Sequence, residues 1–502
     1  MNNLSKIISL FILVVCSSFI LVSCNDDDEF STNANDKLTF EADTIRFDTV
    51  ITTIGSSTKR FKVFNNNDKG IRMTSIRLAS GGNSGFRVNV DGHSGNQLND
   101  IEILRKDSIF IFAEITLNVQ GEDKPVYISD DLLFTLENGV TQKIVLEAYG
   151  QDAIILHSPV INSDTEWDSK KPYIIYDSLI VSKDNTLSIA EGTTICFHQG
   201  AYLGVYGTIQ CHGSQTDPIT LRGDRTDRIF DYLPYDRMDA QWEGVLLYPD
   251  SKNNIFNFVD IHGGNYGIDC PVSSADDYKF FIQNSVIHNV SKNGLRAYYC
   301  LGQVLNSQIS NAGENCVSLI GGYYQFVHTT IAQFYPWNAD HGTALYFTNV
   351  LNDTIYPIEQ AKFNNCLITG GTTDEIVGNR LETGDAAFNV SFENCLVNIK
   401  IEDDAPDDIK KMFTTSVNET GNTKDWAKNS DGSYSDDIIW GKKNFKLIDN
   451  EVFAYDFRLN EKSRARGIGN GNYVEYCPFD LNGVPRPSSQ PDAGCYQFIA
   501  IE

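Results

Sequence analysis

The sequence predicts an all-β protein in which a sandwich of two sheets is followed by a long solenoid of stacked short strands. The chain has 502 residues, too many for one ordinary core, so two or three domains are expected. Its first part carries short β-branched and aromatic runs separated by turn residues. Its second part repeats a six-residue pattern at a spacing near 22 residues and shows little helical periodicity.

Residues 1–23 have the features of a bacterial secretory signal peptide. Lys6 precedes an apolar run from Ile7 to Val22, which is too short for a comfortable transmembrane span. The run ends in Leu-Val-Ser-Cys24, which resembles the lipobox of bacterial lipoproteins. The resemblance implies that Cys24 becomes the first residue of the mature chain and carries a lipid anchor. The alternative is an ordinary secretory signal in which Cys24 is incidental.

The next segment, residues 24–36, is acidic and begins with Asn-Asp-Asp-Asp-Glu at positions 25–29. Such a cluster directly after a lipidated cysteine resembles the export tag of some Gram-negative surface lipoproteins. The resemblance implies an outer-membrane protein that faces the cell exterior. A solvated tether is the alternative, because runs of like charge are often no more than that.

Residues 37–152 are expected to form the sandwich. Seven strand-like runs occur in about a hundred residues, and Asn-Gly and Asn-rich turns separate some of them. Residues 55–78 (GSSTKRFKVFNNNDKGIRMTSIRL) are similar to immunoglobulin-like modules that follow the anchors of bacterial surface proteins. The runs lie at residues 44–53, 59–64, 71–78, 86–90, 108–117, 132–136 and 142–149.

A six-residue pattern recurs in the second part. Its copies start 26, 22, 22, 37 and 29 residues apart, as expected for a solenoid with occasional insertions. Positions 1, 4 and 6 are apolar or small, and position 3 is Asn in four of six copies. The copies are residues 256–261 (FNFVDI), 282–287 (IQNSVI), 304–309 (VLNSQI), 326–331 (FVHTTI), 363–368 (FNNCLI) and 392–397 (FENCLV).

The spacing within the pattern predicts a corner between two strands. Strict alternation cannot place positions 1, 4 and 6 on one face, but a bend at position 3 can. Asn tolerates the left-handed backbone conformation that such a bend needs, and its amide can bond to the Asn of the next rung. We therefore expect Phe363 to end one strand, Asn365 to turn the corner, and Cys366 and Ile368 to point inward.

Stacked asparagine corners resemble the right-handed parallel β-helix family. The predicted fold class is thus an N-terminal immunoglobulin-like β-sandwich followed by a right-handed parallel β-helix. The resemblance covers roughly residues 155–502, with opening rungs at 187–189, 192–195, 201–205, 207–209, 217–221 and 242–246. Residues 153–455 would form the parallel β-helix, and residues 456–502 resemble its closing segment. A second sandwich or a jelly roll is the alternative, although neither requires this register.

Composition limits the partners. The formal net charge is −26, which excludes a nucleic-acid backbone because phosphate binding needs clustered Lys and Arg. Of 11 Cys, Cys16 leaves with the signal and Cys24 takes the lipid. The remaining nine form an odd set without a zinc-type spacing, and we expect most of them to be small buried residues.

Catalytic and metal candidates follow from the β-helix resemblance. Polygalacturonase-like hydrolases would carry Asn-Thr-Asp, Asp-Asp, Gly-His-Gly and Arg-Ile-Lys on successive rungs, and these motifs do not occur in that order; Asp340 and His341 only partly match. Asp269 and Arg296 occupy matching places one rung apart, either as an acid and a base or as a cross-rung ion pair. Calcium is the one cofactor considered, at Asp224, Asp227 and Asp231, where a salt-bridged surface loop is the alternative.

Aromatic pairs give the preferred functional hypothesis, because flat rings on a rigid ladder suit stacking against sugars. The predicted carbohydrate-binding residues are Tyr298, Tyr299, Tyr323, Tyr324, Tyr335 and Trp337. The expected function is a lipid-anchored surface protein that binds an extended polysaccharide along the β-helix. Alternatives are a polysaccharide lyase or glycoside hydrolase acting on such a ligand, and a structural spacer or adhesin. The aromatic rings could also pack the solenoid or its loops.

The anchor hypothesis predicts the behaviour of Cys24→Ala. Without the thiol no lipid is attached, so the protein should leave the membrane fraction and lose its partition into detergent, as fractionation and phase separation would show. Unchanged partition into detergent would contradict the lipoprotein assignment.

Overall fold

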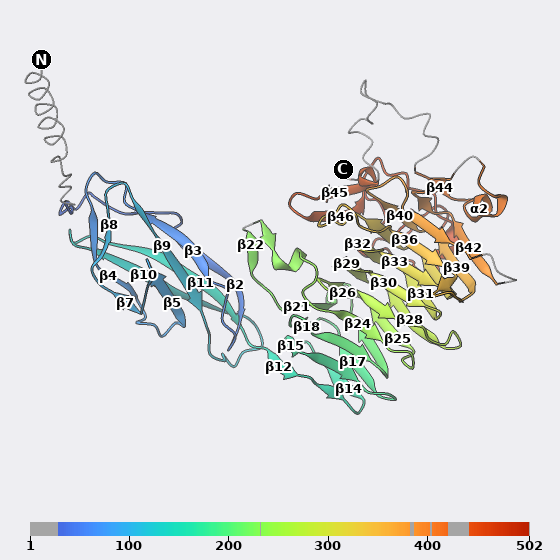
Figure 1. Ribbon diagram of the computed structural model, residues 1–502, viewed down its shortest axis with the longest axis horizontal. Helices are drawn as coiled ribbons and strands as arrows, with labels where there is room; N and C mark the ends of the chain where they lie inside the picture. The colour runs from blue at the N-terminus through green and yellow to red at the C-terminus, as the bar shows by residue number, and fades with distance from the viewer. Residues whose placement is uncertain (1–28, 231, 382–385, 402–403, 420–440, 501–502) are drawn as a thin grey trace, which may run out of the picture. The chain divides into compact units, whose positions relative to one another are not determined.

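The computed structural model describes residues 29–500 except 231, 382–385, 402–403 and 420–440 (Figure 1). The signal peptide and residues 24–28 of the acidic segment, including Cys24, therefore lie outside the described residues. The chain divides near residue 151 into two compact units. In the part of the chain that the structure describes, no helix is long and apolar enough to cross a membrane.

The first unit is a β-sandwich, as predicted. Its two sheets pack around a core that includes Phe61, Ile76, Phe86, Phe134 and Leu146. Pairing is antiparallel except between β2 and β11. One sheet has the order β1 (Thr39–Phe40), β3 (Lys59–Phe64), β9 (Ser108–Ile115), β5 (Phe86–Val90), β6 (His93–Ser94). The other has the order β2 (Thr44–Ile51), β11 (Thr141–Gln151), β10 (Val126–Leu136), β4 (Ile71–Leu78), β7 (Gln97–Leu98), and β8 (Ile101–Ile103) also pairs with β4.

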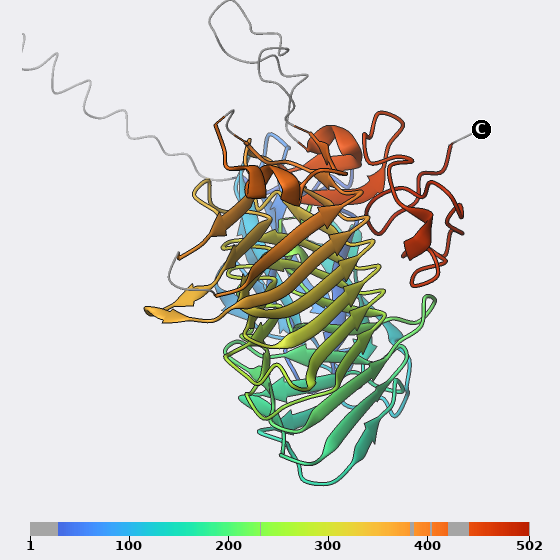
Figure 2. The same ribbon diagram turned by 90° about the vertical axis from the view of Figure 1, so that its right-hand side faces the viewer.

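The second unit is a parallel β-helix, which confirms the predicted fold class (Figure 2). Successive strands enter three parallel sheets in turn, and every rung buries apolar side chains in one continuous core. We call the sheets 1, 2 and 3.

The strands of sheet 1 are, in order, β12 (Ile154–His157), β15 (Tyr173–Tyr176), β18 (Thr194–Phe197), β21 (Ile219–Gly223), β26 (Val259–His262), β29 (Val286–Val290), β32 (Gln308–Ala312), β35 (Thr330–Gln333), β40 (Leu367–Gly370), β43 (Leu396–Val397) and β44 (Val417–Asn418). Those of sheet 2 are β13 (Val160–Ile161), β16 (Ser178–Val181), β19 (Tyr202–Val205), β24 (Gly244–Leu247), β27 (Ile268–Cys270), β30 (Leu295–Tyr298), β33 (Val317–Ile320), β36 (Leu345–Thr348) and β41 (Ile376–Asn379). Those of sheet 3 are β14 (Thr165–Trp167), β17 (Thr186–Ala190), β20 (Thr208–His212), β25 (Asn254–Asn257), β28 (Tyr278–Gln283), β31 (Leu301–Leu305), β34 (Gly322–Val327), β39 (Ile358–Asn364) and β42 (Phe388–Glu393).

The predicted register is confirmed at every copy of the repeat. The first residues of the six copies pair in sequence from Phe256 to Phe392 across sheet 3. Their last residues pair from Ile261 to Val397 across sheet 1. Each hexapeptide therefore passes from sheet 3 to sheet 1, and the change of direction falls at position 3.

Position 3 has the left-handed conformation that the spacing predicts. Asn365 has φ 53° and Asn394 has φ 53°, while Phe258 and His328 occupy the same corner in other copies with φ 51° and 48°. Asn306 donates to Asn284, and Asn284 to Asn257, at 2.8 and 3.0 Å.

Position 4 explains the repeated cysteines. Cys366 and Cys395 are buried, and the backbone N–H of Cys366 donates to the Sγ of Cys395 at 3.3 Å. Ser285 and Ser307 make the equivalent contact on earlier rungs at 3.1 Å. Small polarisable groups at this position thus bond the backbone of the preceding rung from inside the corner. All nine described Cys are buried free thiols.

Two segments outside the repeat pack on the outer face of sheet 1. The insertion between β21 and β24 contains β22 (Arg228–Phe230), β23 (Leu233–Pro234) and the 3-10 turn η1 (Tyr235–Arg237). The C-terminal segment contains η3 (Lys442–Asn444), β45 (Phe445–Asp449), β46 (Ala454–Leu459) and η4 (Gly471–Tyr473). The remaining elements are β37 (Val350–Leu351), β38 (Thr354–Ile355) and the helix α2 (Asp407–Met412).

The C-terminal segment continues the corner bonding where the asparagine ladder ends. Asn365 donates to His328 and to the carbonyl of Asn470, both at 2.9 Å, and Asn394 donates to the carbonyl of Ile468. The predicted bond between successive asparagines is therefore correct for Asn284 and Asn306 but replaced at Asn365 and Asn394. The segment also covers Leu367 and Leu396, which face outward from sheet 1 and join a separate small core.

Replacing Asn365 should weaken the β-helix. Asn365→Ala removes the side-chain hydrogen bonds to His328 and to both the carbonyl and the N–H of Asn470. The loss should lower the free energy of unfolding by about 1–3 kcal/mol in denaturant titrations. Asn352→Ala is the matched control, because Asn352 is exposed with φ 48° and shares only the backbone strain. Equal losses in the two variants would contradict a stabilising role for the corner amide.

Candidate functional site

The outer face of sheet 1 brings two histidines together. His262 at the end of β26 pairs in register with His288 on β29. Side chains at equivalent positions of neighbouring parallel strands lie about 4.8 Å apart. The two imidazole rings accordingly stack with their centroids 4.8 Å apart at an interplanar angle of 29°. The repeat thus fixes both rings on one face of the solenoid.

Two carboxylates complete a cluster with these histidines, which we call the His–Asp cluster: Asp236, Asp260, His262 and His288. His262 Nδ1 contacts Asp260 Oδ1 at 2.8 Å, and His262 Nε2 contacts Asp236 Oδ1 at 2.9 Å. His288 Nε2 also contacts Asp260 Oδ1, at 3.2 Å. Arg222 on β21 holds Asp236 through an ion pair of 2.6 Å. Both ring nitrogens of His262 therefore face carboxylates.

The electrostatics follow from these contacts. Burial raises the pKa of Asp236, but the hydrogen bond and charge of His262, with the charge of Arg222, outweigh it and lower the pKa to about 2. Partial burial also raises the pKa of Asp260, whose side chain is 37% exposed, yet the charges of His262 and His288 hold it well below its usual value. Burial alone would lower the pKa of His262, but the charge of Asp260 and hydrogen bonds to both carboxylates raise it to about 9. His262 is therefore a cation at neutral pH.

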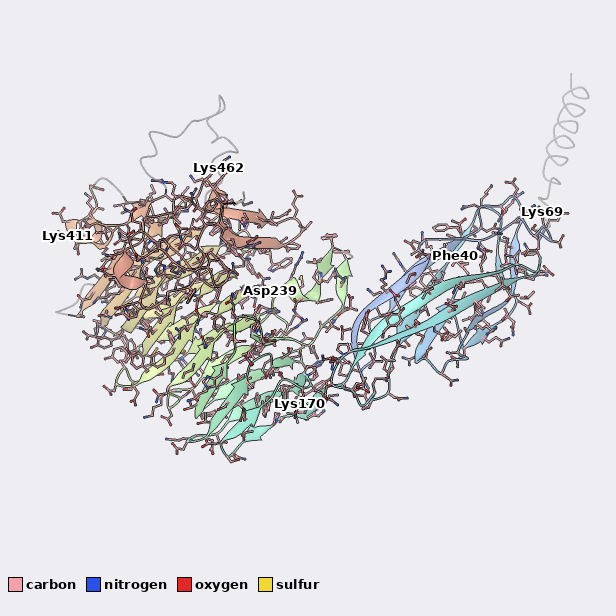
Figure 3. All side chains as sticks on the ribbon, turned by 180° about the vertical axis from the view of Figure 1, so that it is seen from behind. Phe40, Lys69, Lys170, Asp239, Lys411 and Lys462 are labelled. Carbon is pink, nitrogen blue, oxygen red and sulfur yellow. The ribbon has the colours of Figure 1, made fainter. Side chains whose placement is uncertain are left out.

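The insertion supplies Asp236 and the residue after it. Its turn η1 lies over sheet 1, where the carbonyl of Arg237 accepts a hydrogen bond from Asn289 at 3.2 Å. Asp239, labelled in Figure 3, accepts a hydrogen bond from the hydroxyl of Tyr335. Gln241 donates to two carbonyls of the turn at 2.7 and 3.0 Å. These contacts fix the insertion against the rungs below it.

A cleft of about 420 Å³ opens beside the cluster, between the insertion, sheet 1 and the β45–β46 hairpin. We call it the sheet 1 cleft. His288 belongs to both the cleft and the His–Asp cluster. The cleft wall combines aromatic rings with hydrogen-bonding groups, and it includes Arg237, His288, Gln308, Asn311, Phe453, Tyr455, Arg458, Asn482 and Tyr496.

Asn311 lines this cleft and carries a buried acceptor without a partner. Its side-chain nitrogen donates to Asn289 at 3.2 Å, in a second corner ladder at the other end of the sheet 1 strands. Its Oδ1 has no hydrogen-bond partner among the described residues, although the residue is 1% exposed. An unpaired buried acceptor costs about 1–3 kcal/mol. Because this oxygen is inaccessible to solvent, a ligand donor would reach it only if neighbouring side chains moved.

The predicted aromatic residues do not share one side of the solenoid. Tyr323 is 38% exposed on sheet 3, but its neighbour Tyr324 points into the core and donates to the carbonyl of Ala297 at 3.0 Å. Tyr335 is 8% exposed and bonded to Asp239. Neither buried ring has a free face for a sugar, because both are packed inside.

The other predicted rings lie elsewhere. Trp337 packs on Phe453, with ring centroids 3.9 Å apart, and so supports a wall of the sheet 1 cleft. Tyr298 ends β30 on sheet 2 under the guanidinium of Arg296, and Tyr299 contacts Tyr356. A second cavity, of about 230 Å³, lies on sheet 2 and is lined by Tyr202, Tyr248, Tyr266 and Asp269 among others.

Asp269 and Arg296 form a cross-rung ion pair, which is one of the two interpretations that the sequence allows for them. They pair in register, and the guanidinium contacts the carboxylate at 2.7 and 2.6 Å. Asp340 is exposed, and His341 Nδ1 contacts the carbonyl of Gly342 at 2.7 Å. The structure brings neither Asp340 nor His341 to the sheet 1 cleft.

The two calcium candidates that the structure describes, Asp224 and Asp227, both have side-chain partners. Asp224 contacts His198 at 2.7 Å, and Asp227 forms a two-point pair with Arg225 at 2.7 and 2.6 Å. Asp231 lies outside the described residues. The salt-bridged loop was the alternative for this insertion, and the observed pairs agree with it.

Sequence reasoning missed the His–Asp cluster. A signal was present, because two successive hexapeptides, ending at Ile261 and Ile287, are each followed by histidine. Once the register is known, these histidines must be neighbours on the face opposite to Ile261 and Ile287. Asp236 gave no such signal, since it belongs to the non-repetitive insertion.

Comparisons with known proteins identify no family for this chain. No family model and no curated protein matches it. A catalytic domain of a GH87 alpha-1,3-glucanase in complex with tetrasaccharides shares 10% identity over 67% of this chain and 80% of that chain, with a TM-score of 0.20. A GH87 alpha-1,3-glucanase catalytic domain in complex with nigerose shares 11% identity over 68% of this chain and 82% of that chain, with a TM-score of 0.18. A PapD-like domain of human CEP192 gives 9% identity over 23% of this chain and 86% of that chain, with a TM-score of 0.17.

The cluster predicts a pH-dependent stability. Because the pKa of His262 is raised in the folded protein, its ionisation stabilises the fold. This stabilisation is full below pH ~6.5 and is lost as the pH rises through about 9. Asp236→Asn removes one of the two stabilising carboxylates, so the pKa of His262 should fall. NMR titration of the ring signals in the presence of a chelator measures this shift. Asp224→Asn is the control and should leave the pKa of His262 unchanged. An unchanged pKa of His262 in Asp236→Asn would show that Asp236 does not stabilise the charged imidazole.

Proposed function

We propose that the protein is a lipid-anchored surface protein that binds carbohydrate in the sheet 1 cleft. The composition of the cleft wall carries this proposal, because aromatic rings and hydrogen-bonding side chains meet there, as sugar recognition requires. The anchor on Cys24 and the outward-facing location in the outer membrane are proposed from the sequence motif and the acidic segment alone.

The rest of the cleft wall suits the same ligand. Tyr455 and Phe453 offer apolar ring surface, which packs against the C–H faces of sugars. Arg237 donates to the carbonyl of Val452 at 2.9 Å and carries further N–H groups on the same guanidinium. A volume of about 420 Å³ is within the range of small-ligand sites, roughly 300–1,000 Å³.

The cleft is favoured over the tyrosine-lined cavity on sheet 2. That cavity is smaller, and the carboxylate of Asp269 on its wall already forms a two-point pair with Arg296. Sugar recognition needs both a ring face and polar groups that converge on the hydroxyls. The cleft offers both.

A second candidate function is cleavage of the bound carbohydrate. One observation favours it: His288 lines the cleft while its Nε2 contacts Asp260, so a titratable group with a carboxylate partner reaches the ligand site. Product analysis after incubation with each bound glycan tests this function. Loss of products in His288→Ala with retained binding would support cleavage.

The binding proposal predicts the effects of two substitutions. A panel of neutral and acidic polysaccharides identifies a ligand for the wild-type protein, and calorimetry then compares variants. Tyr455→Ala and Asn482→Ala should each weaken binding about tenfold, or roughly 1.4 kcal/mol, because one loses a stacking ring and the other an exposed amide of the cleft wall.

Tyr266→Ala is the matched control, since it removes an equivalent ring from the sheet 2 cavity. Tyr323→Ala tests the most exposed of the aromatic residues that the sequence predicts to bind carbohydrate. Affinity lost in either of these variants and retained in Tyr455→Ala would move the site away from the sheet 1 cleft. No binding to any polysaccharide would favour a spacer.

A further inference from the structure

We propose that Asp260, His262 and His288 form a binding site for a divalent transition-metal ion such as Zn²⁺. The inference is independent of carbohydrate binding, because it depends on these three side chains and not on the occupant of the cleft.

The donor atoms converge on one point. Asp260 Oδ1 lies 2.8 Å from His262 Nδ1 and 3.2 Å from His288 Nε2, and all three ligand atoms lie within 4.8 Å of one another. Ligands at about 2.0–2.2 Å from a tetrahedral ion are separated by roughly 3.3 Å. Small side-chain movements would therefore open the triangle around an ion without any change in the strands.

The surroundings match those of a metal ligand. A histidine that binds metal through one ring nitrogen usually donates from the other to a carboxylate, which fixes the tautomer and the ring plane. His262 has this arrangement, with Nε2 against Asp236 at 2.9 Å and Asp236 held by Arg222 at 2.6 Å. The in-register pairing of β26 and β29 fixes the second imidazole.

The donor set selects the class of ion. Two imidazoles and one carboxylate suit Zn²⁺ and its first-row neighbours, whereas Ca²⁺ and Mg²⁺ prefer oxygen ligands. Among the described residues, the ion pairs of Asp260 are with these two histidines alone. Asp260 is thus not already neutralised by Lys or Arg.

Access and proton balance also permit binding. The side chains of Asp260 and His288 are 37% and 25% exposed, so an ion can enter from solvent, while His262 is 6% exposed. In the metal-free protein the proton on His262 Nδ1 points to Asp260. The ion takes that position, the proton goes to solvent, and the Nε2–H bond to Asp236 is retained. Three protein ligands leave at least one coordination position for water or a ligand group.

Titration of the untagged, chelator-stripped full chain with Zn²⁺ tests the proposal. Isothermal calorimetry should show one equivalent bound, and Co²⁺ should give the visible absorption of a nitrogen-ligated ion. His288→Gln and Asp260→Asn should weaken Zn²⁺ binding by more than tenfold, and Asp236→Asn by about 10–100-fold through the outer contact.

His198→Ala is the matched control. His198 directly follows the sheet 1 strand β18, and its Nδ1 contacts the carboxylate of Asp224 at 2.7 Å. Its loss should leave Zn²⁺ binding unchanged. Thermal melting of each variant checks folding. Zn²⁺-dependent shifts of the His262 and His288 ring signals in the wild-type protein test the site without any substitution.

Two results would overturn the proposal. The first is no Zn²⁺ binding by the wild-type chain, and the second is equal binding by wild type and His288→Gln. Either result would show that the His–Asp cluster is an ion-pair network only.

Discussion

The left-handed corner at position 3 of the hexapeptide is the constraint on which the rest of the β-helix depends. It lets a six-residue segment end one strand and begin another while positions 1, 4 and 6 stay inside. Because every copy bends at the same point, every copy stacks in the same register. Rows of equivalent outward side chains then follow from geometry alone. The pairing of His262 with His288 is one such row, so the corner sets the relative position of these two side chains along the solenoid.

A row of side chains on one flat sheet does not enclose a ligand, because it provides only one wall of a cleft. The remaining walls come from segments that do not repeat. The insertion places Asp236 and Arg237 over sheet 1, and the β45–β46 hairpin, more than 200 residues later, places Tyr455 and Arg458 on the other side. The guanidinium of Arg237 bonds to the carbonyl of Val452, which joins the two segments. The repeated part of the chain thus supplies rigidity, and the unrepeated parts supply enclosure.

The sequence predicted what short-range rules determine and missed what depends on distant segments. The corner at Asn365 and the inward Cys366 follow from spacing within six residues, and the structure agrees. Tyr323 and Tyr324 are both among the predicted carbohydrate-binding residues, although adjacent strand residues must face opposite sides, so one of them had to be buried. Tyr335 could not be placed because its partner Asp239 lies 96 residues away in the insertion. His262 and His288 were predictable in principle from aligned repeats, whereas Asn311 reads as one more corner residue until the cleft beside it is seen.

The contacts of His262 limit the roles that the cluster can take. Both of its ring nitrogens are directed at carboxylates, so it has no lone pair left to accept a proton from a substrate. Its burial and fixed charge suit holding Asp260 and Asp236 in place. His288 differs, since one nitrogen contacts Asp260 while the side chain lines the cleft. Any proton transfer to a bound ligand would therefore pass through His288, with Asp260 as its partner. A metal ion would change this division, because both histidines and Asp260 would become ligands and the reactive group would be a molecule bound to the ion.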